Sequence, residues 1–137
     1  MSDCSDTTQK ILASNQAFYQ AFESLRIEEM AKIWHQGPSI TCIHPGWKKL
    51  VGWDPIRASF EGIFSNTDMI QFLVTEEQVH AGESLAWVTC LENIVGKSGS
   101  GEPFTTIQAT NIFRQIDDRW LMVMHHASSY LSGLTVE

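Results

Sequence analysis

Basic residues and long apolar runs are both scarce in this chain, and each shortage excludes a class of partner. The 9 Lys and Arg residues are outnumbered by 16 Asp and Glu residues, so the formal net charge of the 137-residue chain is −7. A charge of this sign repels phosphate backbones and anionic lipid headgroups, and we expect no nucleic acid and no membrane among its partners. Apolar runs such as residues 70–74 and 120–124 have the length of a strand, well short of the ~20 residues that a membrane-spanning helix needs.

Cysteine is also scarce. The chain has three widely separated cysteines, Cys4, Cys42 and Cys90, and no CxxC motif, which argues against a disulfide framework or a zinc site. We therefore expect reduced thiols in a cytoplasmic protein. The 5 histidines form no HxH or HExxH motif, so we expect neither a metal nor another cofactor. Residues 1–6 are polar and acidic, and we expect no secretory signal or transit peptide there.

Apolar residues, which make up 43% of the chain, are sufficient for one folded domain, expected over residues 8–130 with tails at 1–7 and 131–137. Helical periodicity predicts one helix over residues 8–25 and a second from residue 27 that ends before Gly37-Pro38. A third helix is expected to begin at Asp54-Pro55, because Asp is a strong N-cap and Pro suits the first helical position.

The remaining pattern is that of strands. Residues 39–44 form a short alternating segment that ends at Pro45-Gly46. Four long segments rich in β-branched and aromatic residues follow, and short turns between them predict consecutive antiparallel hairpins. These segments are residues 69–80, 85–95, 104–116 and 119–130. The order predicts an α+β fold, in which a curved antiparallel sheet wraps around three N-terminal helices as a cone and encloses a pocket at its open end.

Two polar residues in this pattern are candidates for chemistry. His44 lies between an apolar strand and a rigid Pro-Gly turn, and imidazole is well matched to proton transfer at neutral pH. Asn111 lies in an apolar strand, where an amide must form hydrogen bonds, either to a ligand or to the protein. For both residues a purely structural role remains the alternative: His44 can bond the loop backbone, and Asn111 a neighbouring strand or a water.

The alternation of side chains along a strand assigns several other residues to one face of the sheet or the other. His125 and His126 are adjacent in a strand and therefore point to opposite faces, so they cannot bind one metal together. Trp47 and Trp87 are candidates for an aromatic pocket mouth, with ordinary packing as the alternative. Glu92 is expected to face away from Trp87 and Thr89, as an interface residue or a cross-strand partner.

The order of elements, together with several local motifs, resembles the nuclear-transport-factor-like cone fold, in particular its SnoaL-like and ketosteroid-isomerase-like members. The resemblance covers about residues 8–130. The motifs that carry it are residues 17–22, His44-Pro45-Gly46, Gly52-Trp53-Asp54, Arg57, Phe60-Glu61, residues 120–126 and Ser128. Activities differ widely among members of such a superfamily, so the resemblance implies the fold more strongly than any one reaction.

The resemblance to ketosteroid isomerases implies that His44 occupies the position of the general base. In that family the oxyanion hole is formed by a Tyr on the first helix and by an Asp on the fourth strand that is kept protonated. The matching residues here are Phe18, which cannot donate a hydrogen bond, and Asn111, which can. The chain is also similar to the association domain of calcium/calmodulin-dependent protein kinase II. The basic pocket positions of that domain match neutral residues here, namely Ile56, Thr89, Asn111 and Ala127.

If the family register holds, the face that carries Ala127 looks into the cone, which makes His125 the pocket residue and His126 a surface or interface residue. A bulge in this strand would exchange the two histidines. The expected site then has His44 and Asn111 as catalytic residues. Its expected ligand-binding residues are His125, Trp87, Thr89, Trp47, Phe18 and Ile56.

Two functions of different classes follow from these expectations. In the first, the protein is an isomerase or cyclase of a small apolar carbonyl compound, with His44 as base and Asn111 as hydrogen-bond donor to the enolate. In the second, it is a non-catalytic ligand-binding or association domain. In either case we expect a homodimer that buries an apolar outer sheet face carrying Trp120, Met122, Met124 and His126.

Overall fold

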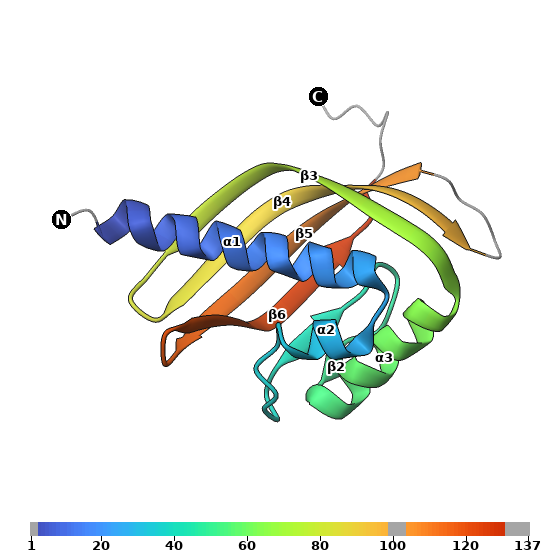
Figure 1. Ribbon diagram of the computed structural model, residues 1–137, viewed down its shortest axis with the longest axis horizontal. Coiled ribbons are helices and arrows are strands. Elements are labelled where there is room, and N and C mark those ends of the chain that lie inside the picture. The colour runs from blue at the N-terminus through green and yellow to red at the C-terminus, as the bar shows by residue number, and fades with distance from the viewer. Residues whose placement is uncertain (1–2, 99–103, 131–137) are drawn as a thin grey trace.

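The computed structural model describes residues 3–98 and 104–130 of the chain. Over these residues it contains three helices and six strands (Figure 1). The helices are α1 (Asp3–Ser24), α2 (Ile27–Ala31) and α3 (Trp53–Ser65). The strands are β1 (Thr41–Ile43), β2 (Leu50–Val51), β3 (Thr67–Ala81), β4 (Leu85–Ser98), β5 (Phe104–Ile116) and β6 (Arg119–Ser128).

The strands form one curved sheet in the order β2-β1-β6-β5-β4-β3. Each neighbouring pair from β3 to β6 is antiparallel, as the short turns predict, whereas β1 pairs with β6 in parallel. Helix α1 lies across one face of this sheet, and α2 and α3 lie together near one end of it (Figure 1). The predicted α+β fold, a curved sheet around N-terminal helices, is confirmed.

Helix α1 buries one face against the sheet. Ile11 and Phe18 on this face are fully buried, and Asn15 and Tyr19 are almost so. Residues four apart follow one another along a helix face, so Asn15 and Tyr19 share the face of Ile11 and point toward the sheet. The helix begins at Asp3, within the segment for which the sequence predicts a tail, while the predicted tail at residues 131–137 lies outside the described residues.

Helix α3 begins one residue before the predicted Asp54 and takes Gly52 as its N-cap. Gly52 has a φ of 92°, a left-handed conformation that residues with a side chain rarely adopt. Its backbone N–H donates to the carbonyl of Ile40, 2.9 Å away, which ties the start of α3 to the segment that precedes β1. Pro55 lies in the first turn of the helix, where its missing N–H costs nothing.

A bulge in β6 changes which of its side chains face inward. Met122 pairs with Phe113 and Met124 with Ile112, so one extra residue, Val123, interrupts the alternation. Trp120 and Met122 before the bulge are therefore buried, as are His125 and Ala127 after it. The prediction that Trp120 and Met122 belong to an apolar outer face is wrong, because strict alternation was assumed along the whole strand.

Candidate functional site

A cavity of about 470 Å³ opens between the sheet, α1, α3 and the turn that follows β1. Its wall is mainly apolar and includes Phe22, Ile63, Ile70, Phe72, Ile94 and Ile107. Three titratable side chains also line it: His44, Glu92 and His125. No Lys or Arg is present among the described residues that line this cavity, so an anionic ligand would gain no ion pair there.

Glu92 and His125 are the two ends of a buried chain of hydrogen bonds. The Tyr19 hydroxyl donates to Glu92 Oε2 at 2.6 Å, and Asn111 Nδ2 donates to the Tyr19 hydroxyl at 3.1 Å. Asn111 Oδ1 lies 2.6 Å from His125 Nδ1, and Asn111 Nδ2 also donates to Asn15 Oδ1 at 2.8 Å. Every member of the chain is buried, so these bonds are shielded from competition with water.

His44, which follows the neighbouring strand β1, is held by a separate set of contacts. Its Nε2 lies 2.9 Å from Ser59 Oγ in α3 and 3.6 Å from Cys42 Sγ in β1. The ring packs edge-on against Trp47, with centroids 4.9 Å apart, and lies 6.4 Å from the ring of His125. Two imidazoles on different elements thus approach the same cavity.

Burial shifts the pKa of each of the three titratable groups in the direction that favours its neutral form. Removal from water lowers the pKa of His44 to about 4 and that of His125 to about 3, with the nearby His44 and His126 adding to the effect on His125. The same desolvation raises the pKa of Glu92 to about 7, although the hydrogen bond from Tyr19 opposes the rise. At neutral pH the cavity therefore holds two uncharged imidazoles and a carboxyl that gains or loses its proton near neutral pH.

Asn111 does not line the cavity, contrary to the prediction that its amide donates to a ligand. It is fully buried behind the cavity wall, and both of its polar atoms already have partners in Asn15, Tyr19 and His125. The direct role in oxyanion stabilisation is therefore wrong for this structure. The alternative of a bond to a neighbouring strand is found instead, since His125 belongs to β6.

Of the other predicted site residues, His125 and Trp47 line the cavity, with Trp47 half-exposed at its edge. Phe18 and Ile56 are fully buried in the hydrophobic core and are not part of the cavity wall. Phe18 nevertheless packs against the His125 ring, with centroids 4.8 Å apart.

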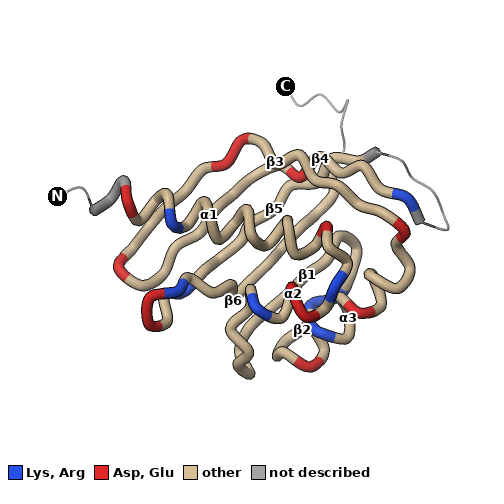
Figure 2. Tube along the Cα trace, viewed as in Figure 1, with Lys and Arg blue, Asp and Glu red and all other residues tan. Residues whose placement is uncertain are grey.

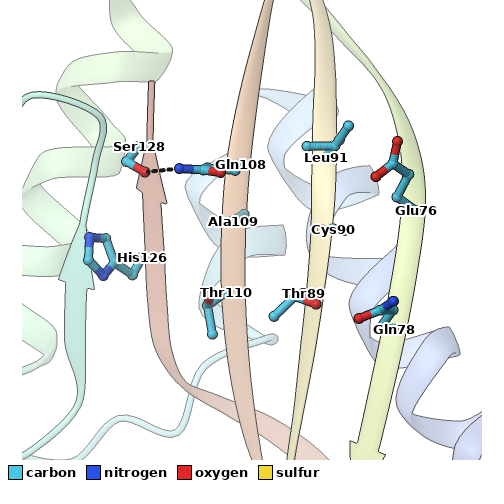
Figure 3. Close-up of a pocket in the computed structure, with 10 residues that line it drawn as sticks. All are labelled: Glu76, Gln78, Thr89, Cys90, Leu91, Gln108, Ala109, Thr110, His126 and Ser128. Carbon is cyan, nitrogen blue, oxygen red and sulfur yellow. Dashed lines mark hydrogen bonds between the residues drawn. The ribbon is translucent and has the colours of Figure 1, made fainter. Parts of the chain in front are cut away.

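Thr89 and Trp87 point away from the cavity, and the prediction for both is wrong. The buried positions of β4 are Ala86, Val88, Cys90 and Glu92, so the residues between them face outward. Figure 3 shows Thr89 on the outer face of the sheet, in a groove of about 370 Å³ that also contains His126, Gln108 and Glu76. Trp87 stacks on His80 of β3. Glu92 faces away from Trp87 and Thr89, as predicted, but it lies on the inner face and they lie on the outer one, the reverse of the predicted directions.

Tyr19, Asn15 and Ser59 were not predicted as site residues from the sequence, and Glu92 was predicted in a different role. A signal for the first two was present, because Ile11, Asn15, Tyr19 and Phe22 follow one helix face at spacings of four, four and three. No such signal marks Ser59, which meets His44 through the packing of α3 on β1.

The described residues contain no group of three His, Cys, Asp or Glu side chains that could hold a metal ion. Their helices are also too short or too polar to cross a membrane. The Lys and Arg residues lie mainly in and around α2, β2 and α3, whereas Asp and Glu residues are spread along the chain (Figure 2).

Comparison with known proteins places this geometry in a family. The model of the SnoaL-like domain matches residues 11–132. A candidate dehydratase of the NTF2-like family from Streptomyces avermitilis is similar in structure, with 32% sequence identity, coverage of 93% of this chain and 99% of that one, and a TM-score of 0.83. A candidate calcium/calmodulin-dependent protein kinase type II association domain from Thiobacillus denitrificans is 28% identical, with 87% and 94% coverage and a TM-score of 0.78.

Among curated proteins, the F-box protein SKIP8 of Arabidopsis thaliana is 27% identical over 125 residues. These residues are 91% of this chain and 52% of that protein. The chain thus spans about half the length of this curated relative.

Proposed function

This chain belongs to the SnoaL-like domain family, and we propose that it is an enzyme that moves protons on a small, neutral carbonyl compound bound in the cone cavity. The observation that supports this proposal is that one apolar cavity is lined by Glu92, whose pKa is about 7, and by the neutral imidazoles of His44 and His125. General acid–base catalysis is most efficient when the pKa of the acid lies near the working pH.

The reaction that uses both kinds of group is the elimination of water from a β-hydroxy carbonyl compound. A neutral imidazole removes the proton α to the carbonyl, and the electrons of that C–H bond form the new double bond. The C–O bond to the hydroxyl breaks as protonated Glu92 gives its proton to the departing oxygen, which leaves as water. The imidazolium then returns its proton to the Glu92 carboxylate, so the enzyme is regenerated.

This reaction shares its first step, enolisation, with the isomerase and cyclase reactions expected from the sequence, and His44 remains a candidate base. The similarity to a candidate dehydratase supports elimination among these possibilities. A non-catalytic binding domain is less well supported, because a carboxyl buried at an apolar wall costs stability whenever it ionises. Such costly groups are concentrated at functional sites.

The proposal is tested with a panel of cyclic β-hydroxyketones in deuterated buffer at pH 6.5. We expect the wild-type protein to form the conjugated enone, followed by its ultraviolet absorbance, and to incorporate deuterium at the α carbon, followed by NMR. Glu92→Gln should stop elimination, whereas His126→Gln, a change on the outer face, serves as the matched control and should not. Equal rates with and without the wild-type protein across the panel would contradict the proposal.

We also propose a cytoplasmic location and a homodimer formed through the outer face of the sheet. Two described cysteines, Cys42 and Cys90, are free thiols, which supports a reducing compartment. The groove of Figure 3 crosses β3 to β6 on the face opposite α1, and we place the contact between copies on this face, which α1 does not cover. Sedimentation equilibrium at micromolar concentration should give the dimer mass, and a monomer mass would contradict it.

A further inference from the structure

The chain of hydrogen bonds behind the cavity has a defined direction. Glu92 Oε2 accepts from the Tyr19 hydroxyl, which uses the one proton of that hydroxyl. Tyr19 can therefore take part in its contact with Asn111 only as the acceptor, so the atom of Asn111 that faces it is Nδ2. The second proton of Nδ2 is directed at Asn15 Oδ1, which agrees with the same orientation of the amide.

This orientation leaves one arrangement for His125. The atom of Asn111 next to the ring is Oδ1, which can only accept, so His125 Nδ1 must carry a proton and donate it across the 2.6 Å contact. The ring is neutral at ordinary pH, and a neutral imidazole carries one proton. The other nitrogen, Nε2, is then an unprotonated lone pair on a ring that lines the cavity.

His44 is held in the opposite state. The backbone carbonyl of Ile56 can only accept, and the Ser59 hydroxyl donates to it at 2.6 Å. Ser59 Oγ must then accept from His44 Nε2, 2.9 Å away, so in His44 it is Nε2 that carries the proton. The two imidazoles of the cavity are thus fixed as opposite tautomers by two independent anchors, the accepting Oε2 of Glu92 and the backbone carbonyl of Ile56.

We propose that Asn111 is a positioning residue that holds His125 as the Nδ1–H tautomer and so leaves His125 Nε2 as a proton acceptor on the ring that lines the cavity. This inference rests on the proposed function for its chemical meaning and adds His125 to His44 as a candidate base. The partner of a histidine ring commonly decides which of its nitrogens is protonated and how the ring is aimed. A Leu at position 111 would remove this partner while roughly keeping the volume.

The test is the tautomeric state of both rings, read at pH 7 from proton–nitrogen correlation NMR of protein labelled with ¹⁵N-histidine. In the wild type, His125 should show a protonated Nδ1 and a bare Nε2, and His44 the reverse. Asn111→Leu should turn His125 into a mixture of tautomers and leave His44 unchanged. Ser59→Ala is the matched control and should alter His44 alone. Asn111→Asp, which keeps an acceptor beside Nδ1, should preserve the His125 tautomer.

A wild-type His125 protonated at Nε2 would overturn the inference without any variant, so the test survives a variant that fails to fold. A His125 tautomer unmoved by Asn111→Leu would also overturn it. Because no substrate is present, the spectra are independent of whether the protein eliminates water. For a substrate found in the panel above, Asn111→Leu should lower kcat by about 10- to 100-fold, and Asn111→Asp should restore part of the loss.

Discussion

His125 and His126 are neighbours in β6, yet they lie on opposite faces of the sheet in different environments. His125 is buried, bonded to Asn111 and in contact with Phe18 at the cavity, whereas His126 is exposed in the outer groove. The same division separates Glu92 from Leu91 and Thr89 in β4. Whether a residue of this sheet can take part in the proposed reaction therefore depends on the face that it occupies as well as on its residue type.

The largest expected effect of this difference is on turnover. Glu92→Gln keeps an acceptor for the Tyr19 hydroxyl but has no proton to give, so we expect kcat for elimination to fall by about 10²- to 10⁴-fold. Thr89→Ser, on the outer face of the same strand, should leave kcat unchanged. Steady-state kinetics on both variants check this prediction, and similar losses in the two would remove the distinction between the faces.

The pH dependence of stability should differ as well. Glu92 binds its proton more tightly in the folded protein, with a pKa of about 7, than in the unfolded chain, where the ordinary value is 4.5. Its ionisation therefore costs stability progressively as the pH rises from about 4.5 to about 7. Glu92→Gln is free of this cost, so its stability relative to wild type should rise across that window by up to about 3 kcal/mol. Urea denaturation at pH 5 and pH 8 measures the change, and a difference independent of pH would contradict it.

Tyr19→Phe should have a smaller effect, through the chain behind the cavity. It removes the hydrogen bond that opposes the rise in the Glu92 pKa and leaves Asn111 Nδ2 with one partner fewer. We expect a loss of about 1–3 kcal/mol in unfolding free energy and a shift of the alkaline limb of the pH–rate profile to higher pH. An unmoved alkaline limb would show that Tyr19 does not act on the acid of the reaction.

The smallest effect is expected at the outer face itself. His126→Gln should leave the activity unchanged, because His126 faces away from the cavity. It should change the unfolding free energy of a protomer by less than about 0.5 kcal/mol, because its side chain is exposed within the protomer. Thermal denaturation and the elimination assay measure both quantities. A large loss of activity would mean that the outer groove, and not only the cavity, contributes to the reaction.

The sequence was sufficient for the arrangement of elements but insufficient for the directions of several side chains. Long β segments with short turns, and the periodicity of α1, predict the sheet and the helix across it, because these signals are local. The placement of His44 and His125 at the cavity was also expected. The directions of Glu92, Thr89 and Trp120 were not, since the β6 bulge and the register of β4 against its neighbours are set by tertiary packing that no local pattern records.

Asn111 shows a second limit of the sequence. An amide in an apolar strand indicates a buried hydrogen bond, but it does not identify the partner. Here the partners come from α1 and β6, distant in the chain, and they turn a predicted ligand donor into a residue that contacts His125 from behind the cavity.

The central claim is that Glu92 is a carboxyl able to give up a proton near neutral pH, and a carbon NMR titration tests it most directly. Protein labelled with ¹³C at the glutamate side-chain carboxyl, with Glu92→Gln to assign the resonance, should show a midpoint near pH 7 for Glu92. A midpoint near the ordinary value of 4.5 would mean that Glu92 is ionised at neutral pH, has no proton to donate, and is not the acid of this site.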